Sequence, residues 1–103
     1  AVILIDAMLS GNKVGSITRF DAGIKSLPTT MFRCSSHAIS VGETIELARA
    51  LNRLPTHVIV YGIEGARFDP GRAMSPEVTS ALNTIVDQIS LEVQTLLSEQ
   101  VAR

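Results

Sequence analysis

The chain opens on an apolar run, residues 1–5, that constrains its fold more than any other segment. All five residues are hydrophobic, so a strand formed here would be buried on both faces. Such strands belong to parallel sheets covered by helices on both sides, and they seldom begin a domain without neighbours. The run therefore predicts an interior strand of an α/β domain that ends at Asp6. We also expect that something upstream of this run is missing from the sequence.

Two further segments have the composition of strands. Residues 14–20 mix β-branched and polar side chains, which is typical of an edge strand, here antiparallel to the first strand. Residues 57–61 are apolar and β-rich and precede Gly62, so they predict a central strand. Residues 10–13 predict a turn, and residues 21–36 predict a long connection of the kind that often carries function.

Two segments have the apolar periodicity of helices. Ser40 and Glu43 fit a capping box, which predicts a helix that begins near Ser40 and continues until Pro55 ends it. Ser75 followed by Pro76 is typical of a second helix start. The apolar positions of this second helix continue for about five turns or more. They are Val78, Leu82, Ile85, Ile89, Val93 and Leu96.

The order strand, edge strand, helix, strand, helix predicts a three-layer αβα sandwich around a mostly parallel sheet. A chain of 103 residues, 46% of them hydrophobic, can bury one core but is too short for two independent domains. We therefore expect residues 1–103 to belong to a single α/β domain.

Composition excludes several classes of partner. The formal net charge is -1 and both signs are spread along the chain, so the sequence has no basic patch for nucleic acid. A helix that crosses a bilayer needs about 20 apolar residues, and no apolar run in the sequence approaches this length, so we do not expect a membrane as a partner. The single cysteine, Cys34, cannot form an internal disulfide, which favours a reducing cytoplasm.

Three titratable side chains are expected at the carboxyl ends of the strands, where α/β sheets bind ligands. Asp6 ends the first strand, Glu64 follows the last one, and His37 precedes a helix. A carboxylate after an apolar run needs a cation or backbone amides, and a carboxylate with an imidazole suits zinc, nickel or iron. Asp6 and His37 are therefore candidate metal ligands. The alternatives are that Asp6 caps a turn at residues 7–8 and that His37 bonds to the backbone.

Other reactive residues have weaker cases. Cys34, three residues before His37, suggests a nucleophile with its base. In an extended segment, however, Cys34 and Ser36 point to one side and His37 to the other, which disfavours this pairing. Glu64 is either a general base or a brace for its loop through Arg67 or Arg72. The second histidine of the chain lies ahead of its strand and is expected at the surface.

Short blocks along nearly the whole chain resemble the hydrogenase maturation endopeptidases in order and spacing. The blocks are Ile3-Leu4-Ile5-Asp6-Ala7, Gly11, Gly15, Arg19-Phe20-Asp21, Ser35-Ser36-His37, Tyr61-Gly62-Ile63-Glu64-Gly65, Gly71 and Ser75-Pro76-Glu77-Val78. No single block is specific. The Ser-Ser-His block followed by the Gly-Ile-Glu-Gly and Ser-Pro-Glu-Val blocks is the distinctive combination.

The resemblance implies an enzyme that removes the carboxyl-terminal extension of the nickel-iron hydrogenase large subunit after nickel insertion. The family's metal site uses an amino-terminal Glu, an Asp that ends a central strand, and the His of the Ser-Ser-His block. The last two match Asp6 and His37, which the resemblance makes the catalytic and metal-binding residues, with nickel supplied by the substrate protein. The segment that carries the Glu is absent, so the chain resembles the carboxyl-terminal two-thirds of the protease domain and should lack the family's first strand and helix. An inactive fragment is one expectation.

Two other functions remain open at this point. One is a non-catalytic nickel checkpoint or chaperone module that binds the immature large subunit without cutting it. The other is a structural α/β domain of a different enzyme, in which Asp6 and His37 only satisfy turns. Cleavage of a nickel-loaded large-subunit precursor would separate the three.

Overall fold

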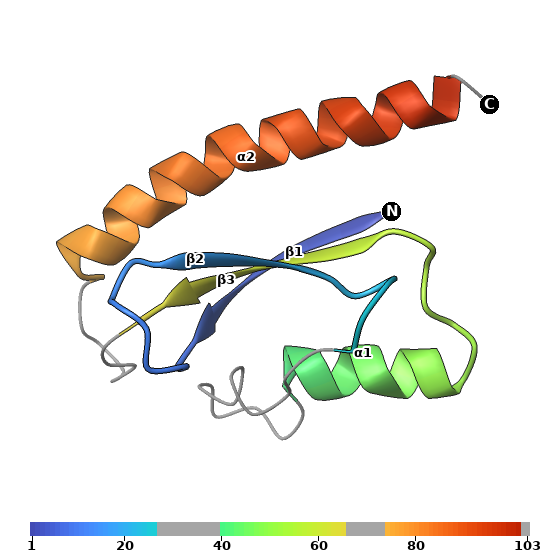
Figure 1. Cartoon of the computed structure of the whole chain (residues 1–103), viewed down its shortest axis with the longest axis horizontal. Helices are drawn as coiled ribbons and strands as arrows, with labels where there is room; N and C mark the ends of the chain where they lie inside the picture. The colour runs from blue at the N-terminus through green and yellow to red at the C-terminus, as the bar shows by residue number, and fades with distance from the viewer. Residues whose placement is uncertain (27–39, 66–73, 102–103) are drawn as a thin grey trace.

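The computed structural model describes residues 1–26, 40–65 and 74–101, which form a mixed α/β arrangement of strands and helices (Figure 1). In chain order the elements are β1 (Val2–Met8), β2 (Ile17–Asp21), α1 (Val41–Ala50), β3 (Val58–Glu64) and α2 (Pro76–Val101). The predicted order of strands and helices is confirmed.

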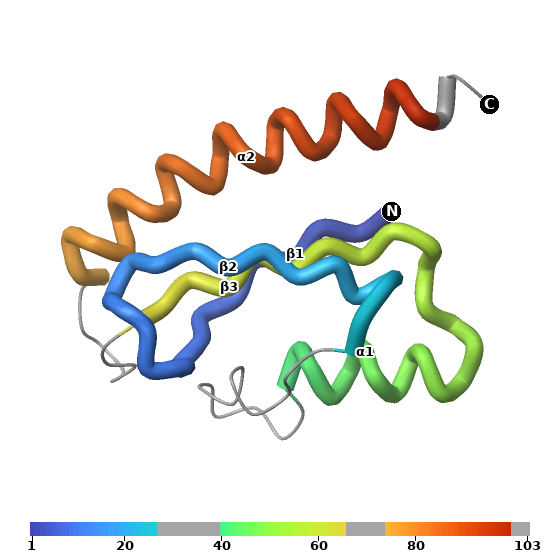
Figure 2. The backbone as a smooth tube through the Cα atoms, in the orientation of Figure 1, coloured from blue at the N-terminus to red at the C-terminus, as the bar shows by residue number. Residues whose placement is uncertain are grey.

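The described strands form one sheet in the order β1-β3-β2. β1 pairs with β3 in parallel, with Asp6 beside Gly62, and β2 pairs with β3 antiparallel, with Thr18 beside Gly62. Figure 2 shows that the chain runs in one direction along β1, in the opposite direction along β2, and in the direction of β1 again along β3. β2 is thus antiparallel to β1 in direction, as predicted, although its hydrogen-bonded neighbour is β3.

The side chains of β3 alternate between two apolar clusters, one on each face of the sheet. Val58 and Val60 pack with Ile45 of α1, whereas Ile59, Tyr61 and Ile63 pack with α2. Successive strand residues point to opposite faces, so a strand that is apolar at nearly every position needs cover on both sides. Figure 1 shows α1 and α2 on opposite sides of the sheet. All residues of β3 are buried, which confirms the predicted central strand.

β1 differs from its prediction in length and in burial. It extends two residues past Asp6 to Met8, because the ladder with β3 continues to the pair formed by Met8 and Glu64. It also lies at one edge of the described sheet. Val2 and Ile5 are 38% and 47% exposed. The expected burial on both faces is therefore not met among the described residues.

β2 begins at Ile17 rather than at residue 14 because a bulge precedes it. Gly15 donates its N–H to the Glu64 carbonyl, and Ser16 accepts the Glu64 N–H, each at 2.8 Å, so two residues oppose one. Gly15 has φ +88°, and a Cβ there would lie 2.9 Å from the carbonyl oxygen of Glu77 in α2. Only glycine fits this left-handed, close-packed position.

α1 has the predicted start and an earlier end. The Ser40 hydroxyl accepts the Glu43 N–H at 3.2 Å, as the capping box requires. The helix stops at Ala50, five residues before Pro55, because Asn52 takes the left-handed conformation with φ 57°. The Arg53 N–H then donates to the Ala48 carbonyl at 2.8 Å, which closes a Schellman motif.

α2 begins at Pro76, and the Ser75 hydroxyl accepts the Val78 N–H at 3.3 Å, as predicted. The helix has 26 residues, which is longer than the apolar series alone required. Neither helix in the described ranges combines the length and the hydropathy that a membrane crossing requires.

A polar cluster of Arg19, Tyr61 and Glu92 connects the middle of α2 to the sheet. Arg19 Nε lies 2.7 Å from Glu92 Oε1, and the Tyr61 hydroxyl donates to the same oxygen at 3.0 Å. The Arg19 hydrogen bond is the main reason that the pKa of Glu92 is lowered from 4.5, and burial opposes this effect. Burial, followed by the Glu92 hydrogen bond, raises the pKa of Tyr61, so its hydroxyl stays protonated as the donor.

This cluster predicts a small pH-dependent stabilisation. A lowered pKa in the folded state favours folding above the unfolded pKa, and the gain is lost as the pH falls through the folded value. Because the Arg19 side chain is 46% exposed, we expect Arg19→Met to cost at most about 1 kcal/mol at pH 7. The cost should shrink below pH 4.5 as Glu92 becomes protonated. Urea unfolding at pH 7 and at pH 3 measures both values, and an equal cost at the two pH values would contradict the assignment.

Candidate functional site

Asp6 lies on the face of the sheet that α1 covers. Leu4 and Met8, two residues away on either side, pack into the cluster around Ile45, and residues two apart in a strand share a face. The Asp6 side chain is partly buried, and its neighbour on β3, Gly62, adds no side chain to that face. On this face of β1, the Asp6 carboxylate therefore lies between the apolar side chains of Leu4 and Met8, which pack with Ile45 of α1.

The alternative prediction for Asp6 was that it caps a turn at residues 7–8, and its backbone contact matches this in part. Asp6 Oδ1 accepts the Ala7 N–H at 2.9 Å. However, residues 7 and 8 continue β1 and do not form a turn, so this bond caps no turn. Asp6 is therefore held within a strand, close to the strand's carboxyl end but not at its last residue.

Glu64 occupies the same face, two residues further along β3. It pairs with Met8 in the parallel register and is only 2% exposed. Both of its carboxylate oxygens accept the Ser10 N–H, at 2.9 and 3.2 Å, and Oε1 also accepts the Ser10 hydroxyl. Of the two roles predicted for Glu64, these contacts match the brace, with Ser10 as its partner. Arg67 and Arg72 lie outside the described residues.

The Ser10–Glu64 pair was missed by sequence reasoning. The two residues are 54 positions apart, and a serine in a turn is too common to indicate a distant partner. The available signal was the parallel pairing of the strands that precede each residue, which brings the two strand ends together. Recognising the pair required the register, which sequence reasoning did not predict.

The carboxyl ends of β1 and β3 lie at one end of the sheet, because the two strands are parallel. In Figure 1 the amino end of α1 is the end of that helix nearer to the carboxyl ends of β1 and β3. Ser40, which caps α1, is buried there. His37 and Cys34 lie outside the described residues, so the predicted pairing of Asp6 with His37 stays a prediction. Within residues 1–26, 40–65 and 74–101, no three His, Cys, Asp or Glu side chains are grouped to hold a metal.

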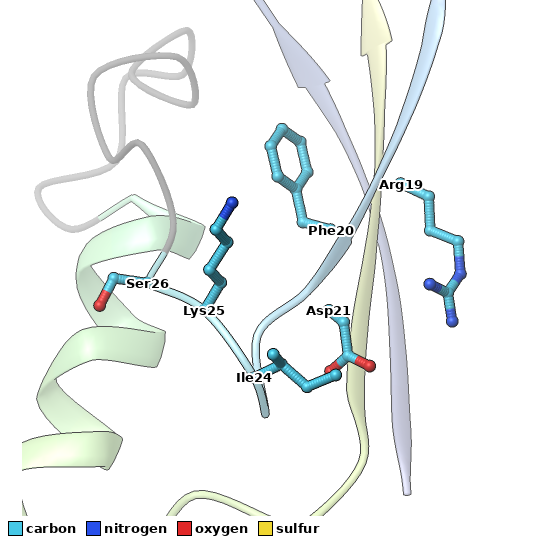
Figure 3. Close-up of a pocket in the computed structure, with 6 residues that line it drawn as sticks. All are labelled: Arg19, Phe20, Asp21, Ile24, Lys25 and Ser26. Atoms are coloured by element: carbon cyan, nitrogen blue, oxygen red, sulfur yellow. The ribbon is translucent and has the colours of Figure 1, made fainter.

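A surface pocket lies at the other end of the sheet. It is lined by Arg19, Phe20, Asp21, Ile24, Lys25 and Ser26, and Figure 3 shows Arg19 and Phe20 on opposite sides of β2. Asp21 pairs with Ile59, near the amino end of β3, whereas Asp6 pairs with Gly62 near its carboxyl end. This pocket is therefore separate from the candidate site.

The second histidine, His57, is a surface residue as expected. Its side chain is 37% exposed, and its Nε2 lies 3.9 Å from Glu99 Oε2. An exposed pair at this distance contributes little to stability. His57 also precedes β3, at the end of the sheet away from the carboxyl ends of the parallel strands.

Comparison with known proteins adds one positive result. A family model described as hydrogenase maturation protease matches residues 1–92. Comparisons with curated proteins and with solved structures gave no match. The matched span contains Asp6, His37 and Glu64, together with all three strands, α1 and most of α2.

Proposed function

Because the chain belongs to the hydrogenase maturation protease family, we propose that the protein removes the carboxyl-terminal extension of a nickel-iron hydrogenase large-subunit precursor. The observation that carries this proposal is the family match over residues 1–92. Membership supports a hydrolase that processes a precursor protein. The proposal goes beyond family membership in two respects, which are the dependence on nickel and the identity of the cleaved extension.

Asp6 and His37 are proposed to hold the nickel that the precursor brings to the site. A carboxylate and an imidazole are suitable donors for nickel. Asp6 lies on the face that α1 covers, and only two residues separate His37 from the buried cap Ser40. Three residue steps span at most about 11 Å, so the proposal requires the segment before Ser40 to bring His37 to the carboxyl end of β1.

The site would couple cleavage to nickel insertion. Nickel held there can polarise the scissile carbonyl or position the water that attacks it. Asp6 would contribute a negative charge from a strand whose main chain is paired with β3 before the precursor binds. Hydrolysis adds water across one peptide bond and releases the carboxyl-terminal peptide.

The architecture proposed around this site is a three-layer αβα sandwich within a single domain that includes residues 1–103. The packing of α1 and α2 on opposite faces of β3 supports it. A cytoplasmic location is proposed as well, since Cys34 is the only cysteine and has no partner for an internal disulfide.

The proposal is tested by incubating the complete protein with purified large-subunit precursor, either nickel-loaded or nickel-free. Intact-mass spectrometry should show loss of the carboxyl-terminal peptide from the nickel-loaded precursor only. Binding of the nickel-loaded precursor without any change in its mass would instead indicate a non-catalytic checkpoint. Equal cleavage of both precursors would refute the role of nickel.

A further inference from the structure

Glu64 is the most deeply buried carboxylate among the described residues, and the proposed metal chemistry does not use it. Its exposed fraction is 2%, and the ion pairs of the described ranges do not include it. The hydrogen bonds to its side chain come from the N–H and the hydroxyl of Ser10. A buried carboxylate costs free energy unless hydrogen bonds receive it, so Ser10 is the residue that compensates Glu64 here.

The backbone of Glu64 is itself firmly placed. Its N–H donates to Ser16 and its carbonyl accepts from Gly15, both at 2.8 Å. The next residue, Gly65, donates to the Met8 carbonyl at 3.1 Å. The Glu64 backbone therefore joins β3 to the segment before β2, and Gly65 joins it to the end of β1. The Glu64 side chain adds a connection to Ser10, in the segment that leaves β1.

The end of β1 needs such a connection. β1 lies at the edge of the described sheet, where β3 is its paired strand. Strand ends open more easily than strand centres, and Asp6 is only two residues from Met8, the last residue of β1. The backbone ladder ends at Met8, so without the Ser10–Glu64 contact an opening there would propagate toward Asp6.

We propose that Glu64 is a positioning residue of the cleavage site, which holds Ser10 and thereby fixes the end of β1 that carries Asp6. This inference rests on the proposed function in assigning the metal role to Asp6. The strand spacing and the rise per residue place the Cα atoms of Asp6 and Glu64 about 8 Å apart on the same face. We therefore expect Glu64 to influence the position of Asp6 through the main chain of β1 and not through a direct side-chain contact.

The contacts also argue against a general base. A general base needs an oxygen that can reach a substrate proton. In Glu64 both oxygens accept hydrogen bonds from Ser10, and the side chain is closed to solvent. Glutamine can accept the Ser10 N–H and donate to its hydroxyl, so Glu64→Gln keeps the brace but removes any base, whereas Glu64→Leu removes both.

The first test compares these variants in cleavage of the nickel-loaded precursor. Because displacing a reacting group by about 1 Å can cost about 100-fold in rate, we expect Glu64→Leu to lower kcat by about 10- to 100-fold with KM nearly unchanged. Glu64→Gln should stay within about 3-fold of the unaltered enzyme, and Ser10→Ala should fall between the two. Leu82→Ala, which loosens the opposite face, should lower Tm without this loss of kcat. Equal loss in Glu64→Gln and Glu64→Leu would overturn the inference and make Glu64 a base.

A second test does not depend on cleavage. Amide hydrogen exchange in the complete protein should be at least about 10-fold faster at Met8 in Glu64→Leu than in the unaltered protein, and near normal in Glu64→Gln. Unchanged exchange in Glu64→Leu would overturn the inference whether or not the protein cleaves. If the unaltered protein fails to cleave but the exchange result holds, the proposed function fails and the bracing of β1 stands.

Discussion

Asp6→Asn and His37→Ala should each lower kcat/KM for cleavage of the nickel-loaded precursor by at least about 100-fold. Asparagine preserves the size of Asp6 and can still accept the Ala7 N–H, but it removes the negative charge that would hold nickel. Alanine removes the imidazole donor. Because each change removes a metal ligand, the loss should exceed the 10- to 100-fold effect that is typical when only the support of a ligand is lost.

Matched control variants separate this effect from loss of folding. Asp87→Asn removes an exposed carboxylate from α2, and His57→Ala removes the exposed histidine ahead of β3. Both controls should cleave at nearly the normal rate. Intact-mass time courses give the rates, and far-UV circular dichroism checks that all four variants are folded. Normal cleavage by Asp6→Asn and His37→Ala would remove the proposed metal role.

Ile85→Ala should lower the free energy of unfolding of the complete protein by about 2 to 5 kcal/mol. Ile85 of α2 is 0% exposed and packs against the face of β3 formed by Ile59, Tyr61 and Ile63. Removing its side-chain carbons loses apolar burial and leaves a cavity between helix and sheet. Since domains have a total stability of about 5 to 15 kcal/mol, this single change is a large fraction of it.

The neighbouring residue supplies the control for Ile85. Val86 is 63% exposed, so Val86→Ala should change stability by less than about 0.5 kcal/mol. Urea unfolding followed by circular dichroism measures both variants. A cost below about 1 kcal/mol for Ile85→Ala would contradict the packing of α2 on β3.

The order and type of the elements could be predicted because each has a local signal. Ser40 and Ser75 form caps that depend only on residues within one turn, and the structure shows both. The residues of β3 are apolar on both faces, and both faces are covered. These features depend on short-range chemistry, so single-sequence reasoning could identify them.

The boundaries depended on contacts between distant residues and were less predictable. β1 reaches Met8 because Glu64 lies beside it, and β2 starts late because Gly15 and Ser16 form a bulge opposite Glu64. The partner of Glu64 illustrates the same limit, since the sequence suggested Arg67 or Arg72, whereas in the structure Ser10 provides the contact. For the candidate site, the predicted ligand Asp6 lies near the carboxyl ends of β1 and β3, whereas its pairing with His37 stays a prediction.

The central claim is that Asp6 and His37 bind the same nickel ion, and a structure of the complete protein bound to nickel-loaded precursor tests it most directly. Anomalous scattering at the nickel edge would locate the ion. We predict a donor oxygen of Asp6 and an imidazole nitrogen of His37 at about 2.0 to 2.2 Å from it, which places the two donors within about 4 Å of each other. Nickel bound elsewhere, or Asp6 and His37 on opposite faces of the sheet, would contradict the account.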